Sequence, residues 1–174
     1  MERYANYDFD LVSLQRIEIA NVKNQLSNKK GIYFWFFKLT DKIVYIGIGI
    51  GTGGLKKRIV SQHLNAKYIE FRTEKHTHKD EYQLAHAIPR LSKNNKTTRL
   101  GIDKSALRKA IGRRLDLKPG TETVDYILDN LYLKVFETDD SKMIKALEIQ
   151  LIKQFKPLFN SFYNPKDKQQ EKVI

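Results

Sequence analysis

Two apolar runs joined by a short polar turn constrain the fold of this chain more than any other feature. Both runs are dense in aromatic and β-branched side chains, which favour strands. They read GIYFWFFKL over residues 31–39 and IVYIGI over residues 43–48, with Thr40, Asp41 and Lys42 between them. The sequence therefore predicts an antiparallel β-hairpin.

The hairpin is expected to belong to a chain of mixed helices and strands. Apolar spacing and capping residues predict helices over residues 8–27, 55–66 and 105–115, a short helix from Thr121, and a long helix from about residue 139 that ends before Pro157. The run LYLKVF at residues 131–136 predicts a third strand. Residues 67–103 are polar and basic with weak periodicity, so we expect mostly loop there.

Composition narrows the class of protein. A chain of 174 residues with 41% hydrophobic side chains suits a single compact domain. The absence of cysteine excludes disulfides, thiolate–zinc sites and cysteine nucleophiles. No apolar run approaches the roughly 20 residues that span a bilayer, and residues 1–10 lack the apolar core of a signal peptide. We expect a soluble cytoplasmic protein with no membrane partner.

Positive charge is concentrated in the middle of the chain. The formal net charge is +12, and residues 55–120 hold 17 basic against six acidic residues. A local excess of this size is what a polyanion-binding face needs, so nucleic acid is the favoured partner. A solvated surface or a patch for anionic lipid would use the same charge, and composition leaves both open.

Two features of the predicted elements point to chemistry. Tyr33 and Tyr45 lie in the hairpin strands, where alternation can place them on one face. Taken alone, two strand tyrosines are more often core or surface aromatics than catalytic groups. Glu148 lies in an apolar helix stripe, four residues after Ile144 and three before Leu151. A carboxylate on a buried face is costly unless it is paired or binds a cation, and pairing with a lysine is the alternative.

These features coincide with a known pattern, because the chain resembles the GIY-YIG nuclease family. Gly31-Ile32-Tyr33 and Tyr45-Ile46-Gly47 match both halves of the signature that names the family. Two further segments match its arginine-bearing helix and its closing element, namely Leu55 to Arg58, and Ala146-Leu147-Glu148 to Ile152 with Phe155, Pro157 and Asn160. Four elements in the right order are far more specific than either tripeptide alone.

The resemblance implies a fold and a division of the chain. The implied fold is an α/β (α+β) sandwich with a small three-stranded antiparallel sheet flanked by helices. Residues 31–160 would form the nuclease domain, interrupted at about 66–130 by a basic insertion that is largely helix and loop. Residues 1–30 would be an N-terminal helical extension, and residues 161–174 a C-terminal tail.

The resemblance also implies hydrolytic cleavage of DNA with one divalent metal, Mg²⁺ or Mn²⁺. Tyr33 would be the general base or orient the attacking water, and nearby positive charge would have to lower its pKa from about 10. Tyr45 would hydrogen-bond the scissile phosphate or the water. Arg58 would stabilise charge on the phosphoryl oxygens. Glu148 would hold the metal, and Asn160 would fix a neighbouring group or the phosphate.

One position departs from the family pattern. The family often has a histidine or tyrosine four residues after the arginine, but here Gln62 occupies that place and His63 follows it. Five residues turn an α-helix by about 500°, so the side chains of Arg58 and His63 would diverge by roughly 140°. Either His63 reaches the site through a local distortion, which we favour, or Gln62 takes its place.

Further basic residues are expected to contact nucleic acid. Lys56 and Lys57 precede Arg58 and are expected to bind phosphate, although they would also solvate the helix. The insertion supplies arginines that hold phosphates or read guanine edges, namely Arg72, Arg90, Arg99, Arg108, Arg113 and Arg114. His76 and His78 form a His-x-His, but without a nearby carboxylate pattern they make a poor metal site.

The biological role admits several interpretations. A compact chain with no visible separate DNA-binding module suits a restriction or defence nuclease, and a homodimer would let both strands be cut. A repair or mobile-element nuclease is the alternative. A non-catalytic nucleic-acid-binding module on the same fold is a different class. The presence of Tyr33, Tyr45, Arg58 and Glu148 together argues against that class.

Overall fold

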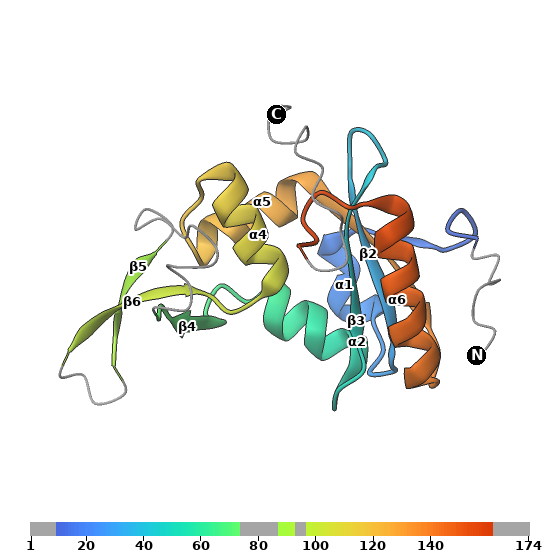
Figure 1. Cartoon of the computed structure of the whole chain (residues 1–174), viewed down its shortest axis with the longest axis horizontal. Coiled ribbons are helices and arrows are strands. Elements are labelled where there is room, and N and C mark those ends of the chain that lie inside the picture. Colours follow the sequence, from blue (N-terminus) through green and yellow to red (C-terminus); the bar gives the residue numbers. More distant parts are fainter. Residues whose placement is uncertain (1–9, 74–86, 93–96, 162–174) are drawn as a thin grey trace.

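Two antiparallel sheets organise the computed structural model, which describes residues 10–73, 87–92 and 97–161 (Figure 1). The larger sheet has the order β1-β7-β2-β3, built from Arg16–Ile17, Leu131–Glu137, Gly31–Phe37 and Ile43–Gly49. The smaller sheet has the order β4-β6-β5, built from Ile69–Phe71, Thr98–Asp103 and Ile88–Leu91. The mixed α+β architecture is confirmed, but the expectation of one three-stranded sheet is wrong.

The predicted hairpin is confirmed as β2 and β3. The two strands pair in register from Gly31 with Gly49 to Trp35 with Tyr45, and a register shift follows Trp35. Strand β7 pairs antiparallel along the other side of β2. Strand β2 is therefore internal in the sheet and buried over most of its length, which explains why its sequence is apolar without a two-residue alternation.

Helices cover both faces of the larger sheet (Figure 1). On one face, Ile32, Phe34 and Ile46 pack against apolar residues of α6 (Ser141–Phe155). The opposite face carries Tyr33, Trp35 and Tyr45 and is covered by the short helix α2 (Gly54–Lys56), the π-helix η2 (Lys57–His63), α4 (Ala106–Leu115) and α5 (Thr121–Asn130). The tyrosines thus lie in an apolar layer between the sheet and these helices.

The helix predicted over residues 8–27 is wrong. That segment contains β1, the 3-10 helix η1 (Ile19–Asn21) and the short helix α1 (Val22–Gln25). Ile17 and Ile19 are both buried although they are only two residues apart, which suits extended chain better than one helical face. Pairing of β1 with β7 gives the backbone of the latter a second partner.

The expectation that residues 67–103 are mostly loop is also wrong for the part that the structure describes. Strands β4, β5 and β6 form the smaller sheet there. Each of them is short, and charged residues and a proline interrupt their apolar positions. Such strands carry little local signal, because pairing with distant parts of the chain stabilises them.

A buried ion pair joins the smaller sheet to α4. Arg108 Nη2 lies 2.8 Å from Asp103 Oδ1, and both side chains are at most 1% exposed. The same guanidinium donates hydrogen bonds to the carbonyls of Asn65 and Tyr68. The structure therefore does not support the nucleic-acid contact expected of Arg108, because its guanidinium faces the protein interior.

None of the helices within residues 10–73, 87–92 and 97–161 combines the length and the apolar character needed to cross a lipid bilayer.

Replacing Asp103 with Ala would leave the Arg108 charge buried without its carboxylate. We expect the free energy of unfolding, measured by urea denaturation, to fall by about 3–5 kcal/mol. Asp125→Ala removes an exposed carboxylate from α5 and should change that free energy by less than about 0.5 kcal/mol. Equal urea midpoints for the two variants would show that the ion pair does not stabilise the fold.

Candidate active site

The two signature tyrosines meet on the enclosed face of the hairpin. Tyr33 in β2 pairs with Gly47 in β3, and Tyr45 lies two residues before that glycine. The tyrosine rings stack with their centroids 6.3 Å apart and their planes at 25°. A Cβ at Gly47 would collide with the hydroxyl of Tyr33 and lie 2.9 Å from the Tyr45 ring. The glycine therefore gives both rings the space to lie side by side.

A π-helix presents the next residues of the site. In η2 the backbone widens, so that Leu64 N–H donates to the carbonyl of Ile59, five residues earlier, at 2.9 Å. Side chains five residues apart then lie on the same side of the helix. Arg58 and His63 have this spacing and both contact Tyr33. The π-helix is therefore the local distortion that lets His63 reach the site from a position five residues after Arg58.

Gln62 and His63 both take part in the site, with different partners. Gln62 Oε1 accepts a hydrogen bond of 2.6 Å from Arg58 Nη1, which orients the guanidinium. Arg58 Nε donates to the hydroxyl of Tyr33 at 3.3 Å. His63 Nε2 lies 2.7 Å from the same hydroxyl.

His63 is held on both ring nitrogens inside the protein. Its side chain is fully buried, and its Nδ1 lies 2.6 Å from the hydroxyl oxygen of Ser105. Ser105 is the N-cap of α4 and accepts a hydrogen bond from the backbone N–H of Arg108. Burial, together with the charges of Arg58 and Arg108, lowers the pKa of His63 well below its usual value. The imidazole is therefore neutral at physiological pH.

The hydrogen bonds determine where the proton of Tyr33 lies. The Tyr33 side chain is fully buried, and Arg58 is a donor only, so its guanidinium cannot accept the hydroxyl proton. Tyr45 is the donor in its hydrogen bond with Tyr33, because that bond lowers the pKa of Tyr33 and raises the pKa of Tyr45. The acceptor left for the Tyr33 proton is therefore Nε2 of His63. A neutral imidazole that accepts at Nε2 carries its proton on Nδ1, which donates to Ser105. His63 thus presents a lone pair to the tyrosine proton.

Burial governs the acidity of the two tyrosines. It raises the pKa of Tyr33, and the nearby Arg58 guanidinium only partly opposes this effect. It also raises the pKa of Tyr45. The expectation that positive charge lowers the pKa of Tyr33 is wrong, because desolvation of the buried phenolate outweighs the attraction of one guanidinium. Tyr33 can lose its proton only if a neighbouring base accepts it.

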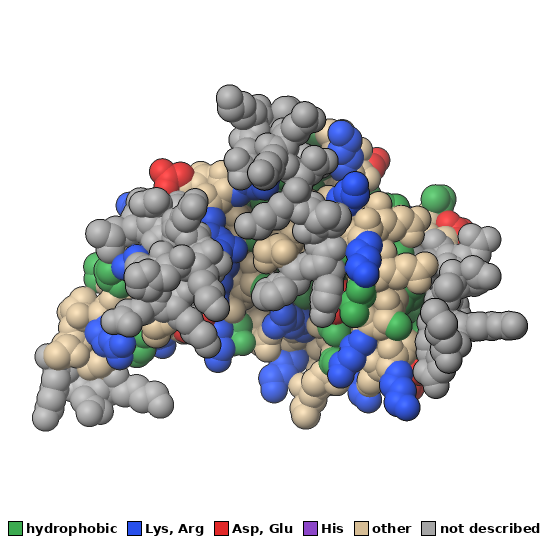
Figure 2. Space-filling view, in the orientation of Figure 1, with side chains coloured by type: hydrophobic (Ala, Val, Ile, Leu, Met, Phe, Trp, Pro, Cys, Tyr) green, Lys and Arg blue, Asp and Glu red, His purple; other side chains and the backbone are tan. Residues whose placement is uncertain are grey.

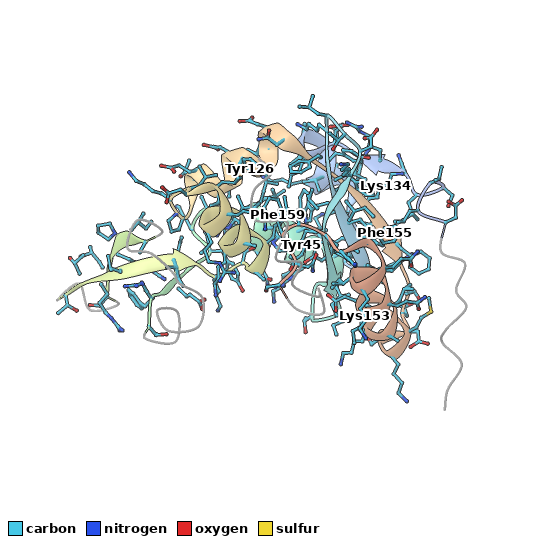
Figure 3. All side chains as sticks on the ribbon, turned by 45° about the horizontal axis from the view of Figure 1, so that its top comes forward. Tyr45, Tyr126, Lys134, Lys153, Phe155 and Phe159 are labelled. Atoms are coloured by element: carbon cyan, nitrogen blue, oxygen red, sulfur yellow. The ribbon has the colours of Figure 1, made fainter. Side chains whose placement is uncertain are left out.

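Glu148 reaches the same region from α6. The predicted start of this helix is confirmed, since Asp140 accepts from the backbone N–H groups of Lys142 and Met143. About two turns before its end, the half-buried Glu148 lines a pocket of about 190 Å³ together with Tyr45, Phe159 and Asn160. Tyr45 and Phe159 lie between α4 and α6 at the centre of the molecule (Figure 3).

The Glu148 carboxylate suits a cation. It has no hydrogen-bond or ion-pair partner in the described part of the chain, and burial raises its pKa to about 7 while Arg58 opposes the rise. A half-buried carboxylate without a partner is stabilised by a bound metal ion. Among the described residues, no group of three or more His, Cys, Asp or Glu side chains surrounds such an ion. Glu148 would therefore be a single protein ligand, with water and phosphate oxygens completing the shell.

Asn160 has a structural partner beside the site. Its Oδ1 accepts from the backbone N–H of Ile46, and its Nδ2 donates to the Ile46 carbonyl, both at 2.8 Å. The amide thus pairs with the outer edge of β3 as a strand would. The group that Asn160 fixes is therefore the backbone next to Tyr45.

The remaining basic residues lie on several elements. Lys57 and Arg58 line a cleft of about 320 Å³ beside the Gly49–Gly54 segment, and Lys56 is the last residue of α2, directly before them. Figure 2 shows many more Lys and Arg than Asp and Glu side chains on the face that it presents. Arg113 and Arg114 lie on α4, and Arg72, Arg90 and Arg99 lie in or next to the smaller sheet. His76 and His78 lie outside the described residues.

Sequence reasoning did not single out Ser105 or Gly47 as part of the site. Ser105 begins a helix of the insertion, and its capping pattern is common to many helices. Its contact with His63 spans 42 residues of chain, so no local pattern announces it. Gly47 belongs to the signature itself, and only the strand register shows why a side chain there would displace Tyr33.

Comparison with known proteins agrees with this geometry. The family model described as the GIY-YIG catalytic domain matches residues 16–173. Neither the curated proteins nor the solved structures gave a match. The match spans most of the chain and includes both signature tripeptides, Arg58 and Glu148. The chain therefore belongs to the GIY-YIG family and is a nuclease, an enzyme that hydrolyses phosphodiester bonds.

Proposed function

We propose that this nuclease is a DNA endonuclease that depends on a divalent metal, Mg²⁺ or Mn²⁺, held by Glu148. The observation that carries the proposal is the arrangement around Arg58. Its guanidinium contacts the buried Tyr33–His63 pair, and its charge acts on the unpartnered Glu148 carboxylate. A site with one base, one cation and one free carboxylate suits attack of water on a phosphodiester.

DNA is proposed as the substrate because of charge. The chain carries a formal net charge of +12, and basic side chains predominate on the face in Figure 2. Contacts between Lys or Arg and phosphates supply most of the non-specific affinity of proteins for DNA. Lys57 and Arg58 share one cleft beside the Gly49–Gly54 segment, so a phosphate in this cleft meets two cations.

His63 provides the base that Tyr33 lacks. Attack of water on phosphorus forms one P–O bond and breaks the bond to the leaving oxygen. The water proton passes to the Tyr33 oxygen while the Tyr33 proton passes to Nε2 of His63, leaving an imidazolium. The 2.7 Å contact between these atoms and the neutral state of His63 support this transfer. Because Tyr33 is fully buried, the pocket beside Tyr45 has to admit the water when DNA binds.

Arg58 and Glu148 act on the phosphate in different ways. Arg58 is fixed by Gln62 and Tyr33, so its fork of donors is positioned before charge develops on the phosphoryl oxygens. Glu148 would hold the metal, which supplies positive charge that stabilises the leaving oxygen. Ser105 acts through His63, because it accepts a hydrogen bond from the Nδ1–H group. The lone pair on Nε2 is then available to the Tyr33 proton.

Within the DNA nucleases we favour a restriction or defence role, with repair or mobile-element function as the alternative. Both sheets belong to one compact chain, so recognition of DNA can take place on the same unit that cuts it. Cleavage of both strands by one site per chain would call for a homodimer. Discrete fragments from a phage genome would support this role, and a smear or simple nicking would favour the alternative.

Replacing Glu148 with Ala removes the proposed metal ligand. We expect cleavage of supercoiled plasmid and of a linear phage genome with Mg²⁺ to fall by roughly 10²-fold or more, while DNA binding in EDTA is retained. Asp129→Asn changes an exposed carboxylate on α5 and should cleave like the wild type. Full activity of the Glu148 variant would overturn the proposed site, and inactivity of the wild type on both substrates would count against the function itself.

The raised pKa of Glu148 predicts how stability depends on pH. Its pKa is about 7 in the folded protein against an ordinary value of 4.5. The stability that the protonated Glu148 side chain contributes to the fold is therefore fully present below pH 4.5 and is lost as the pH rises through 7. In EDTA, Glu148→Gln should therefore have a higher Tm than the wild type at pH 8 and a similar Tm at pH 4.5. The difference is about 2–4 °C for each 1 kcal/mol of destabilisation.

Differential scanning fluorimetry measures both Tm values. Adding Mg²⁺ at pH 8 should stabilise the wild type and leave Glu148→Gln unchanged, because only the carboxylate binds the ion. A Tm difference that does not depend on pH would show that the substitution acts through packing instead.

His63→Gln keeps a hydrogen-bonding side chain but removes the base. We expect the single-turnover cleavage rate to fall by about 10²–10⁴-fold, with little change in the affinity for DNA. Ser61→Ala, an exposed position on the same helix, is the control and should retain its activity. A loss of only a few fold would show that His63 merely packs against Tyr33.

A further inference from the structure

Two arginines face each other across the outer part of the smaller sheet. Arg90 in β5 pairs directly with Arg99 in β6. Both side chains lie on the sheet face that carries Phe71 of β4, because Phe71 pairs with Gly101, two residues from Arg99. The guanidinium carbons of Arg90 and Arg99 lie 4.7 and 4.8 Å from the centre of the Phe71 ring. We call these three residues the arginine pair on Phe71.

The geometry of this pair is held from within the sheet. Arg90 Nη1 donates a hydrogen bond of 2.5 Å to the carbonyl of Ile69, so this guanidinium has a fixed position. Gly101 lies between the strands that carry Arg90 and Phe71, and a Cβ there would lie 3.2 Å from the Cβ of Arg90. Arg99 makes no hydrogen bond through its side chain to the described residues and is exposed, so the Phe71 ring is the group that supports its guanidinium. Contact with the Phe71 ring limits the movement of both guanidinium groups, so binding of a ligand would remove less conformational freedom.

Within residues 10–73, 87–92 and 97–161, the pair has no anionic partner. Like charges directly opposite each other in a sheet are destabilising. Neither guanidinium forms an ion pair in the described part of the chain, and the nearby carboxylates of Glu70 and Asp103 pair with Lys109 and Arg108. Two adjacent guanidinium groups that no described carboxylate neutralises form a site for an anion.

Arg16 shows what a purely structural stacked arginine looks like in this protein. Its guanidinium lies 3.8 Å from the centre of the Tyr132 ring, so it stacks as Arg90 and Arg99 do. It also pairs with Glu18 at 2.5 Å and lies 3.6 Å from Asp41, which neutralise it. The contrast is that no carboxylate in the described part of the chain forms an ion pair with Arg90 or Arg99.

We propose that the arginine pair on Phe71 clamps a backbone phosphate of duplex DNA away from the bond that is cut. The inference rests on the proposed function. A guanidinium fork matches phosphate oxygens, and phosphate contacts position a protein on DNA without reading its sequence. The smaller sheet projects from the body of the molecule, so it extends the DNA-binding face beyond the catalytic pocket (Figure 1).

The test measures binding separately from cleavage. Fluorescence anisotropy in EDTA follows the affinity of the wild type, Arg99→Ala, Arg90→Ala and the double variant for two labelled duplexes of unrelated sequence. We expect each substitution to weaken binding to both duplexes alike and to reduce the slope of log affinity against log salt by about one. Arg16→Ala is the matched control, and its slope should equal that of the wild type.

Two further variants separate the ring from the charge. Phe71→Leu keeps both arginines and removes the stacking surface, so we expect a smaller loss of affinity than in the double variant. Arg99→Lys keeps the charge and loses the planar fork, and it should bind between the wild type and Arg99→Ala. Circular dichroism and Tm compare the fold of each variant with that of the wild type.

The outcomes distinguish this inference from the proposed function. Wild-type binding with unchanged salt slopes in the arginine variants would overturn the clamp and leave the nuclease proposal standing. Loss of affinity for one duplex only would mean that the arginines read bases, which also overturns it. Arginine-dependent binding to anionic vesicles without binding to DNA would assign the pair to lipid headgroups instead. A wild type that neither binds nor cleaves DNA would remove the proposed function and the clamp together.

Discussion

A hydrogen bond of 2.7 Å joins the Tyr33 hydroxyl to His63 Nε2, and the elements around it are arranged so that this contact can form. The hairpin register places Gly47 opposite Tyr33, which leaves space for its ring. The π-helix brings His63 to the face that also carries Arg58. An ordinary α-helix would have turned His63 away, so the unusual backbone supports the site directly. π-Helices are rare, and in proteins generally they are frequently found at functional sites.

The insertion is an integral part of this arrangement. Ser105 caps α4 and contacts His63, and Arg108 one turn later pairs with Asp103 at the end of β6. The ion pair therefore joins the smaller sheet to the helix that begins at Ser105, the hydrogen-bond partner of His63. Burial of two charges is costly unless their hydrogen bonds are satisfied, and the carbonyls of the preceding loop accept further bonds from the guanidinium.

The site combines groups whose acidities are displaced in opposite directions. Burial keeps His63 neutral and raises the pKa values of Tyr33 and Glu148. Each shift opposes charge formation in the free protein, which suits the proton transfer and the bound cation that we propose. Such displaced groups gathered around a pocket are typical of catalytic centres. The membership of the GIY-YIG family and the physical state of these residues lead to the same nuclease chemistry.

The hairpin and the closing helix were predictable from the sequence, because strand composition and helix capping are local patterns. The spacing of the family signature likewise pointed to Tyr33, Tyr45, Arg58 and Glu148 as candidate site residues. The smaller sheet, the strand β1 and the partner of His63 were decided only by the tertiary structure. Short polar strands gain their stability from partners that are distant in the chain. The π-helix shows the same limit, since a spacing of five residues is meaningful only once the backbone is known to widen. Elements that depend on neighbouring residues can therefore be read from the sequence, whereas elements that depend on distant contacts can be seen only in the folded chain.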